Sequence, residues 1–343
     1  MGNIFNINKT LGMEIGHTHY MIDSNFRTVA QGWSRADGTG PLDLWAAKNP
    51  GYVFYTPGQV DGSVQSGGTD AAAIQAAIDA MVDFRGDALF FTPGTYTPAT
   101  ALVINVPDAR WLGPAVSNPV CARASLVAGV AAAFAPTTAA DRMEVGYLRF
   151  VPLTGATMWD SAAVVGLHVH DTFYDTDGIA VDILTVGFVL ATTSEHCVFE
   201  RSRVWVDAAQ GPWIRSAGII KGLNVNGFQL YIEAGTWASA INLAGVGAAA
   251  VDIGPGNISG TGAAALTNLV LVADKTVDDS NGFVHGIRSS THGPTAAALG
   301  ALTVDVATLD VGDSWLAVVL DQAQPTFTSG GAISWESGVP YTG

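Results

Sequence analysis

The segment HVHDTFYDTDG, residues 168–178, holds the densest group of candidate ligand residues in the chain. Asp171, Asp175 and Asp177 carry carboxylate oxygens, which hard cations such as Ca²⁺ prefer. The spacing of an EF-hand loop is missing, and no glutamate stands where its closing bidentate ligand belongs. Aspartate and glycine in such a run favour a turn between two strands. We therefore assign no cation site to these three aspartates.

Two histidines of the same segment suggest a different metal. His168 and His170 are two residues apart, so on a strand they share one face and could both bind zinc. Zinc sites in proteins use three or four side-chain ligands, and no third ligand is evident beside this pair. We assign no metal ligand here.

Acidic residues in the following segment, SEHCVFERSRVWVDAAQG, suggest hydrolytic chemistry. Glu195, Glu200 and Asp207 would approach Asp175 or Asp177 if consecutive turns of a repeated structure lay side by side. Two carboxylates at such a separation are the catalytic groups of glycoside hydrolases. This arrangement is the alternative to a non-catalytic interpretation of the same residues.

The neighbouring basic and aromatic residues leave both interpretations open. Arg201 and Arg203 could bind an anionic sugar, but strand alternation sends some of these charges to solvent, where Arg–Glu ladders are structural. Four aromatic side chains could stack on sugars, although we expect them to be packed in the interior: Trp205, Trp213, Tyr231 and Trp237. We therefore assign no catalytic, cofactor-binding or metal-binding residue, and we expect a non-enzymatic protein.

Composition limits the class of protein. Hydrophobic residues make up 48% of the 343 residues and charged residues only 13%, which excludes a disordered chain. The formal net charge of −15 argues against a nucleic-acid partner, because phosphate binding relies on Lys and Arg. The 40 glycines follow no Gly-X-Y period and indicate frequent turns. We expect Cys121 and Cys197 to be buried thiols, with one long-range disulfide as the alternative.

Neither membrane insertion nor export is indicated. The start, MGNIFNINKTLGMEIG, lacks the basic and apolar regions of a secretory signal. The longest uncharged run, Ala124–Ala140, is interrupted by Ser, Gly, Pro and Thr and makes a poor membrane span.

One helix is strongly indicated, in GGTDAAAIQAAIDAM. Thr69 or Asp70 suits the N-cap, and the apolar residues Ile74, Ile78, Met81 and Val82 fall on one face. The pattern predicts a helix over about 70–83. Short strands are then expected at Ala88–Phe91, Leu102–Val106 and Trp111–Gly113, after an earlier strand at Tyr52–Tyr55.

Segments of alternating apolar character recur throughout the rest of the chain, with starts 15 to 25 residues apart where the series is unbroken. This spacing predicts a solenoid whose coils each contain two or three short strands. The segments are Met143–Val151, Ala163–His170, Ile179–Val189, Cys197–Val206, Ile219–Ile232, Leu266–Val272, Ala301–Val311 and Trp315–Leu320.

The order of these motifs resembles the pectate-lyase-like right-handed parallel β-helix proteins. In that family TD-x-x-AIQ-x-AID is followed by PGTY and a strand ending in Leu-x-Gly or a variant, and residues 67–113 match this order. The segments MEVGYLRFVP, YDTDGIA, RVWVDAAQGP and YIEAGTWASA resemble the β-helix proteins of tailed bacteriophages. The resemblance implies an all-β, right-handed parallel β-helix whose N-terminal helix closes the open first coil.

The family also implies what chemistry to look for. Its lyases hold calcium with clustered aspartates and use an arginine or lysine base, whereas its hydrolases use acidic residues on adjacent coils. Because neither set is evident, the resemblance favours a structural virion protein, such as a spike, a fibre or a capsid decoration. The alternative is a virion-associated polysaccharide depolymerase.

We expect two regions in the chain. Residues 1–66, which contain eight aromatic side chains, form an attachment arm that binds other virion proteins of capsid or tail. Residues 67–343 form the β-helix domain, with last coils or a small C-terminal β element from about 300. The expected assembly is a homotrimer in the virion, built in the host cytoplasm, that contacts surface glycans but neither nucleic acid nor membrane.

Overall fold

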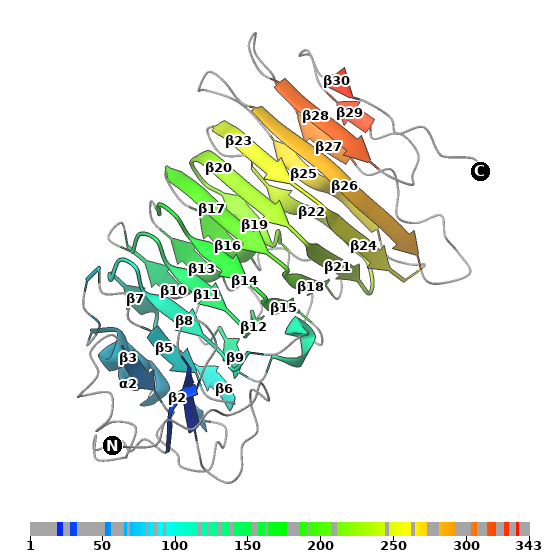
Figure 1. Ribbon diagram of the computed structural model, residues 1–343. Helices are drawn as coiled ribbons and strands as arrows, with labels where there is room; N and C mark the ends of the chain where they lie inside the picture. The colour runs from blue at the N-terminus through cyan, green and yellow to red at the C-terminus, as the bar shows by residue number, and fades with distance from the viewer. Residues whose placement is uncertain are drawn as a thin grey trace.

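Short strands at recurring positions pair side by side and in parallel, which makes the chain an all-β, right-handed parallel β-helix, as expected (Figure 1). The computed structural model describes residues 19–22, 28–32, 52–55, 65–66, 69–79, 81, 83–84, 88–91, 94–115, 118–122, 124–128, 132–137, 140–152, 157–161, 164–176, 186–190, 193–206, 211–243, 247–261, 265–272, 281–291, 303–306, 314–319, 326–328 and 334–335. Each regular coil contributes one strand to each of three ladders.

Ladder 1 contains the first strand of each coil. Its members, in spatial order, are β3 (Tyr52–Tyr55), β5 (Ala88–Phe91), β8 (Arg110–Leu112), β11 (Glu144–Gly146), β14 (His168–His170), β17 (Ser194–Glu200), β20 (Ile219–Asn226), β23 (Gly247–Ile253), β26 (Asn281–Thr291), β28 (Ser314–Val319) and β30 (Ser334–Trp335).

Ladder 2 follows after a sharp corner, and ladder 3 after a longer connection. Ladder 2 contains β4 (Gln65–Ser66), β6 (Gly94–Thr97), β9 (Ala124–Val127), β12 (Leu148–Val151), β15 (Phe173–Asp175), β18 (Arg203–Val206), β21 (Phe228–Ile232), β24 (Gly256–Gly260) and the second half of β26. Ladder 3 contains β7 (Leu102–Ile104), β10 (Ala132–Pro136), β13 (Thr157–Ser161), β16 (Val186–Leu190), β19 (Ile214–Ser216), β22 (Thr236–Asn242), β25 (Ala265–Val272), β27 (Thr303–Val306) and β29 (Thr326–Thr328).

The corner between ladders 1 and 2 is made by a residue in the left-handed conformation. Tyr147, Asp171, Arg201 and Gly227 have φ of 58°, 49°, 48° and 63°. Each N–H continues the stacking, because that of Asp171 donates to Glu200 O (3.0 Å) in the next coil. The paired backbone offsets the strain of placing a non-glycine residue in this region.

The interior of the solenoid is filled by aromatic and aliphatic side chains. Trp111, Trp159, Phe188 and Trp213 are fully buried. Consecutive rings contact one another: the ring centroids of Trp111 and Trp159 are 5.8 Å apart, and those of Trp159 and Phe188 are 6.0 Å apart. The low charge content of the sequence is explained by this continuous apolar core.

The helix α2 (Thr69–Asp79) closes the N-terminal end of the solenoid, as predicted (Figure 1). It follows β4 where a ladder 3 strand would otherwise stand, and it lies against β7. Ile74 and Ile78 are fully buried beneath it. The expected end near residue 83 is wrong, because the Met81 N–H bonds to Ile78 O (3.0 Å) in a tighter turn that ends the helix.

One polar side chain of α2 completes the closure. The amide of Gln75 donates to Val103 O (3.0 Å) and accepts from the Val103 N–H (2.9 Å), so it replaces the missing strand partner of β7. An unpaired strand edge would otherwise invite pairing with another chain. The glutamine of the AIQ motif therefore has a structural reason.

Strands also occur at both ends of the chain. Within residues 1–66, β3 and β4 pair with β5 and β6, so the solenoid sheet includes part of the expected arm. β1 (His19–Ile22) and β2 (Thr28–Gly32) form a separate antiparallel pair. The attachment role of residues 1–66 stays a prediction. From residue 300, β27 to β30 continue ladders 1 and 3 as last coils.

The expected coil length of 15 to 25 residues is too short. Glu144 pairs with His168, and His168 pairs with Val198 30 residues further on. Ladders 1 and 3 gave separate apolar segments in the sequence, so the apparent repeat often measured part of a coil.

The two cysteines are free. Cys197 is buried, as expected. The expectation that Cys121 is buried is wrong, because it ends the short 3₁₀ helix η1 (Pro119–Cys121) in the excursion between β8 and β9, where it is exposed.

Candidate functional site

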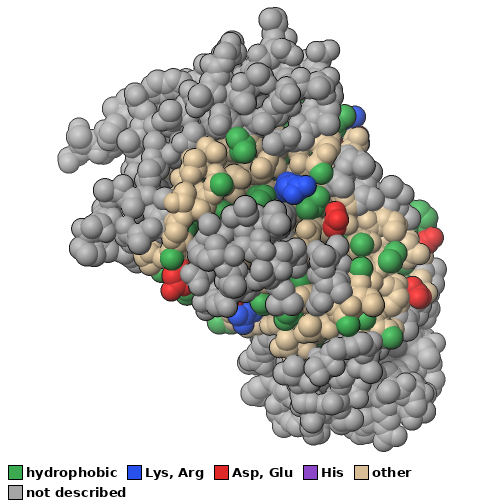
Figure 2. Space-filling view, turned by 180° about the vertical axis from the view of Figure 1, so that it is seen from behind, with side chains coloured by type: hydrophobic (Ala, Val, Ile, Leu, Met, Phe, Trp, Pro, Cys, Tyr) green, Lys and Arg blue, Asp and Glu red, His purple; other side chains and the backbone are tan. Residues whose placement is uncertain are grey.

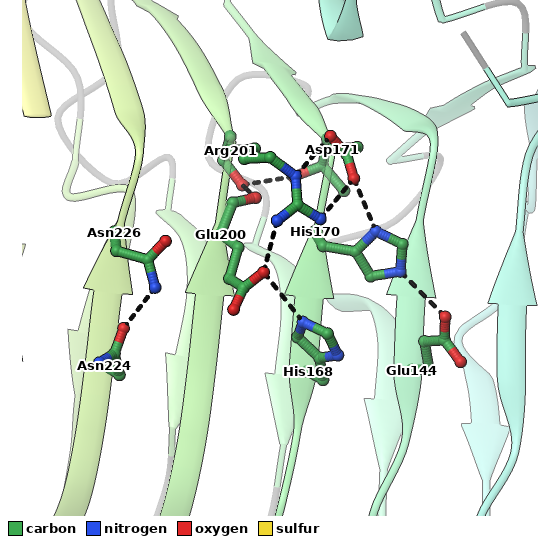
Figure 3. A network of polar contacts seen from close by, with 10 residues as sticks. Glu144, His168, His170, Asp171, Glu200, Arg201, Asn224 and Asn226 are labelled. Atoms are coloured by element: carbon green, nitrogen blue, oxygen red, sulfur yellow. Dashed lines mark hydrogen bonds and ion pairs between the residues drawn. The ribbon is translucent and has the colours of Figure 1, made fainter. Parts of the chain in front are cut away.

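A network of charged side chains lies on the outer face of ladder 1, across β11, β14 and β17 (Figure 3). We define the ladder 1 network as Glu144, His168, His170, Asp171, Glu200 and Arg201. The strand register aligns Glu144 with His168 and His170 with Glu200, so side chains from three successive coils meet. Asn224 and Asn226 lie on the next coil, joined by a 2.6 Å hydrogen bond.

His170 is the centre of this network. Its Nδ1 is 2.9 Å from Asp171 Oδ2, and its Nε2 is 3.0 Å from Glu144 Oε1. A neutral imidazole has only one N–H, so two carboxylate partners require the doubly protonated ring. The ring lies over Gly146, where a Cβ atom would come within 2.5 Å of it. Glycine at this position is therefore required for the contact.

Arg201 connects the third coil. Its Nε and Nη2 donate to the two carboxylate oxygens of Asp171 at 2.9 and 2.8 Å, which is a bidentate ion pair. Its Nη1 donates to Glu200 Oε2 at 2.6 Å. His168 Nε2 lies 3.7 Å from the same Glu200 oxygen. The left-handed corner positions of Asp171 and Arg201 bring these two side chains together on adjacent coils.

The pKa values of the central residues favour the charged forms. Burial lowers the pKa of His170, but its hydrogen bonds to Asp171 and Glu144 outweigh burial and raise it to about 9. Burial raises the pKa of Asp171, but hydrogen bonds from His170 and Arg201 lower it to about 2. The hydrogen bond with His170 holds the pKa of Glu144 below its usual value, against the effect of burial.

The outer residues of the network behave in the same way, except for one histidine. Burial acts to raise the pKa of Glu200, yet the contact with Arg201 lowers it overall. Burial and the nearby charge of His170 lower the pKa of His168, which is therefore neutral at pH 7. At neutral pH the network has three carboxylates, one imidazolium and one guanidinium, each held by an opposite charge.

The three aspartates considered for a cation are not brought together. Asp171 is at the corner, bound to His170 and Arg201, whereas Asp175 is on β15 and forms an ion pair with Arg149. Asp177 lies outside the described residues. The one-residue turn at Asp171 sends the chain onto a different ladder, which sequence spacing alone did not reveal.

The two histidines do share a face, with ring centroids 4.9 Å apart. Each faces a carboxylate of its own, Glu200 for His168 and Glu144 for His170. Within the described residues no group of three or more His, Cys, Asp and Glu is arranged to hold a metal ion.

The carboxylate pair considered for hydrolysis is not assembled from the described residues. Glu195 contacts Lys221 at 3.3 Å, Glu200 belongs to the ladder 1 network and Asp175 faces ladder 2. Asp207 is outside the described part of the chain. The residues that do meet Glu200 include Arg201 and His168.

The expected packing of the four aromatic side chains is half right. Trp213 and Trp237 are fully buried in the core. Trp205 and Tyr231 instead lie on the outer face of ladder 2 and are half-buried. Alternation along β18 and β21 decides this, because Val204, Val206 and their neighbours take the inward positions.

Sequence reasoning missed Glu144 and Gly146 as members of this surface. The residues precede His168 and His170 by one 24-residue coil, a spacing that only the register reveals. A carboxylate two residues before a glycine, one coil ahead of HVH, is the signal that could have found them.

Comparisons with family models, with curated proteins and with solved structures find no match to this chain. The resemblance to pectate-lyase-like proteins is therefore carried by the quoted motifs together with the parallel β-helix fold. In the described part of the chain, no helix has the length and apolar character needed to cross a bilayer.

Proposed function

We propose that this chain is a non-enzymatic structural protein of a tailed-bacteriophage particle, a spike, fibre or decoration of head or tail. The observation that carries the proposal is the mutual charge pairing of the ladder 1 network, in which the most concentrated polar residues of the described surface connect coils to one another. A capped, continuously packed solenoid suits a protein that must stay rigid on a particle.

The charge states in the network disfavour the enzymatic alternative. Glycoside hydrolysis needs one carboxylic acid that stays protonated, with a raised pKa. The pKa values of Glu144, Asp171 and Glu200 are all lowered. A lyase needs a base that can lose its proton, yet the ion pairs with Asp171 and Glu200 raise the pKa of Arg201 further.

A homotrimer is part of the proposal. Figure 2 shows that charged side chains are few and scattered on the back of the described surface, and charged residues are 13% of the chain. A surface with few charges loses little solvation when subunits meet. Light scattering of the purified protein should give three times the chain mass of 35.4 kDa. A monomer at every concentration would refute this part.

Attachment through the N-terminal region is tested by truncation. Deleting residues 1–51 keeps β3 and β4 and so preserves the paired end of the solenoid. We expect this truncated protein to fold, by circular dichroism, and to be absent from particles assembled with it in place of the full chain. A matched deletion of residues 1–66 removes both strands and should also lower stability. Normal incorporation of the first truncation would overturn the attachment role.

The rival function is tested with the full chain. Incubation with capsular polysaccharide or lipopolysaccharide from the host should release no oligosaccharides, as monitored by mass spectrometry. Release that is lost in Glu144→Gln or Glu200→Gln would instead establish a depolymerase. Electron microscopy of the source particle would place the chain on head or tail.

A further inference from the structure

Two aromatic side chains form an outward-facing pair on ladder 2. The strand register aligns Trp205 of β18 with Tyr231 of β21, and these strands lie side by side in Figure 1. The ring centroids are 4.8 Å apart with an interplanar angle of 61°. Both side chains are half-buried, unlike Trp213 and Trp237 in the core. The pair is therefore accessible apolar surface rather than part of the solenoid interior.

The indole is held in a fixed orientation. Trp205 Nε1 donates to Glu233 Oε2 at 2.8 Å. Glu233 is itself fixed, because its N–H donates to Val206 O (2.8 Å) and its carbonyl accepts from the Thr261 hydroxyl. A preorganised platform loses little conformational entropy when a ligand binds.

Polar groups flank the rings on each coil. The outward column beside Trp205 and Tyr231 contains Arg203, Gln229 and Asn257, which are aligned on successive strands. Gln229 and Asn257 are exposed, and their amides offer both donors and acceptors. The surface thus combines a fixed aromatic pair with hydrogen-bonding groups repeated at the coil spacing of roughly 4.8 Å.

We propose that Trp205 and Tyr231 form a binding site for an uncharged oligosaccharide that runs along the solenoid axis. A sugar ring has an apolar face of C–H groups, which suits an aromatic surface, and a polar edge, which suits Gln229 and Asn257. The coil spacing is close to the length of one sugar ring, so successive sugars meet successive coils. This site does not depend on the chain's place in a virion.

Charge decides between the ligands that stack on aromatic rings. Nucleobases also do so, but their phosphates need a basic groove, and this chain has a net charge of −15. Glu233 beside the indole likewise disfavours an anionic sugar. An uncharged saccharide remains the ligand class that fits both the rings and the charge.

The test uses the full chain on a glycan array carrying neutral bacterial O-chain and capsular oligosaccharides, with nucleic acid and anionic saccharides on the same array. We expect saturable binding to neutral saccharides. Trp205→Ala and Tyr231→Ala should each weaken it by roughly tenfold or more, as for other aromatic anchors. Phe84→Ala is the matched control, since Phe84 is 70% exposed at the N-terminal end of the solenoid and should bind normally.

Each outcome decides the proposal. Circular dichroism of both variants confirms folding, and Tyr231→Phe, which keeps the ring, should retain most binding if one alanine variant misfolds. Absence of wild-type binding to any neutral saccharide, equal binding by both alanine variants, or preference for nucleic acid or anionic saccharides would overturn it. None of these results would affect the structural role, which the particle experiments test separately.

Discussion

Replacing His170 by phenylalanine removes the cation between two carboxylates while keeping a ring over Gly146. Glu144 and Asp171 would each lose a hydrogen bond of 3.0 and 2.9 Å, although Asp171 would keep Arg201. Hydrogen bonds to charged groups contribute about 1.5–3 kcal/mol each. Because Glu144 is partly exposed and can rehydrate, we expect a total loss of about 2–3 kcal/mol in the free energy of unfolding at pH 7.

The pH dependence gives an independent measure of the same contribution. The folded-state pKa of His170, about 9, is above the unfolded value of 6.5, so its stabilisation is fully present below pH 6.5 and is lost as pH rises through 9. Linkage gives a loss of roughly 2–3 kcal/mol between about pH 7 and pH 10. Asp171, with a pKa of about 2, stays ionised across this range.

Urea unfolding followed by circular dichroism at several pH values measures the effect, with unfolding rates compared where refolding is incomplete. The wild-type chain should lose its advantage over His170→Phe as pH rises, until the two have similar stability. His168→Phe is the matched control on the same strand; its pKa is lowered, so it should cost less than about 1 kcal/mol. A pH-independent difference between His170→Phe and wild type would refute the imidazolium assignment.

Three further outcomes are expected. Gly146→Ala should reproduce most of the loss seen without His170, because the new methyl would occupy the ring's position, and its stability should show the same weakened dependence on pH. Gln75→Ala should cost about 1 kcal/mol in urea and increase light scattering, since it exposes the edge of β7; unchanged scattering would contradict an edge-covering role. Under native conditions a thiol reagent should label Cys121 but not Cys197, whose pKa burial raises to about 12; labelling of both before unfolding would refute this burial.

Local sequence patterns predicted the cap and several strands well. The apolar spacing of Ile74 and Ile78 indicated one covered helix face, and Ala88–Phe91 is a strand with the predicted bounds. Such features depend on residues within a few positions of one another, so the pattern contains the necessary information. The helix end and the coil length were wrong because both depend on backbone pairing between coils.

The candidate site was only partly predictable. HVHD marked His168 and His170, yet their partners Glu144 and Glu200 lie in the preceding and following coils. The order and spacing of residues could not identify these partners, because excursions of different length separate equivalent strands. The same uncertainty left Trp205 indistinguishable from the buried tryptophans.

The sequence by itself determined an apolar, glycine-rich β chain with a helix suited to cover one end. It did so because hydrophobic periodicity and turn residues act over short distances. Only the tertiary structure decided which charges meet. Register between coils and the left-handed corners at Asp171 and Arg201 turned scattered acidic and basic residues into a paired network. A shift of one residue in a strand would have sent the same side chains into the core.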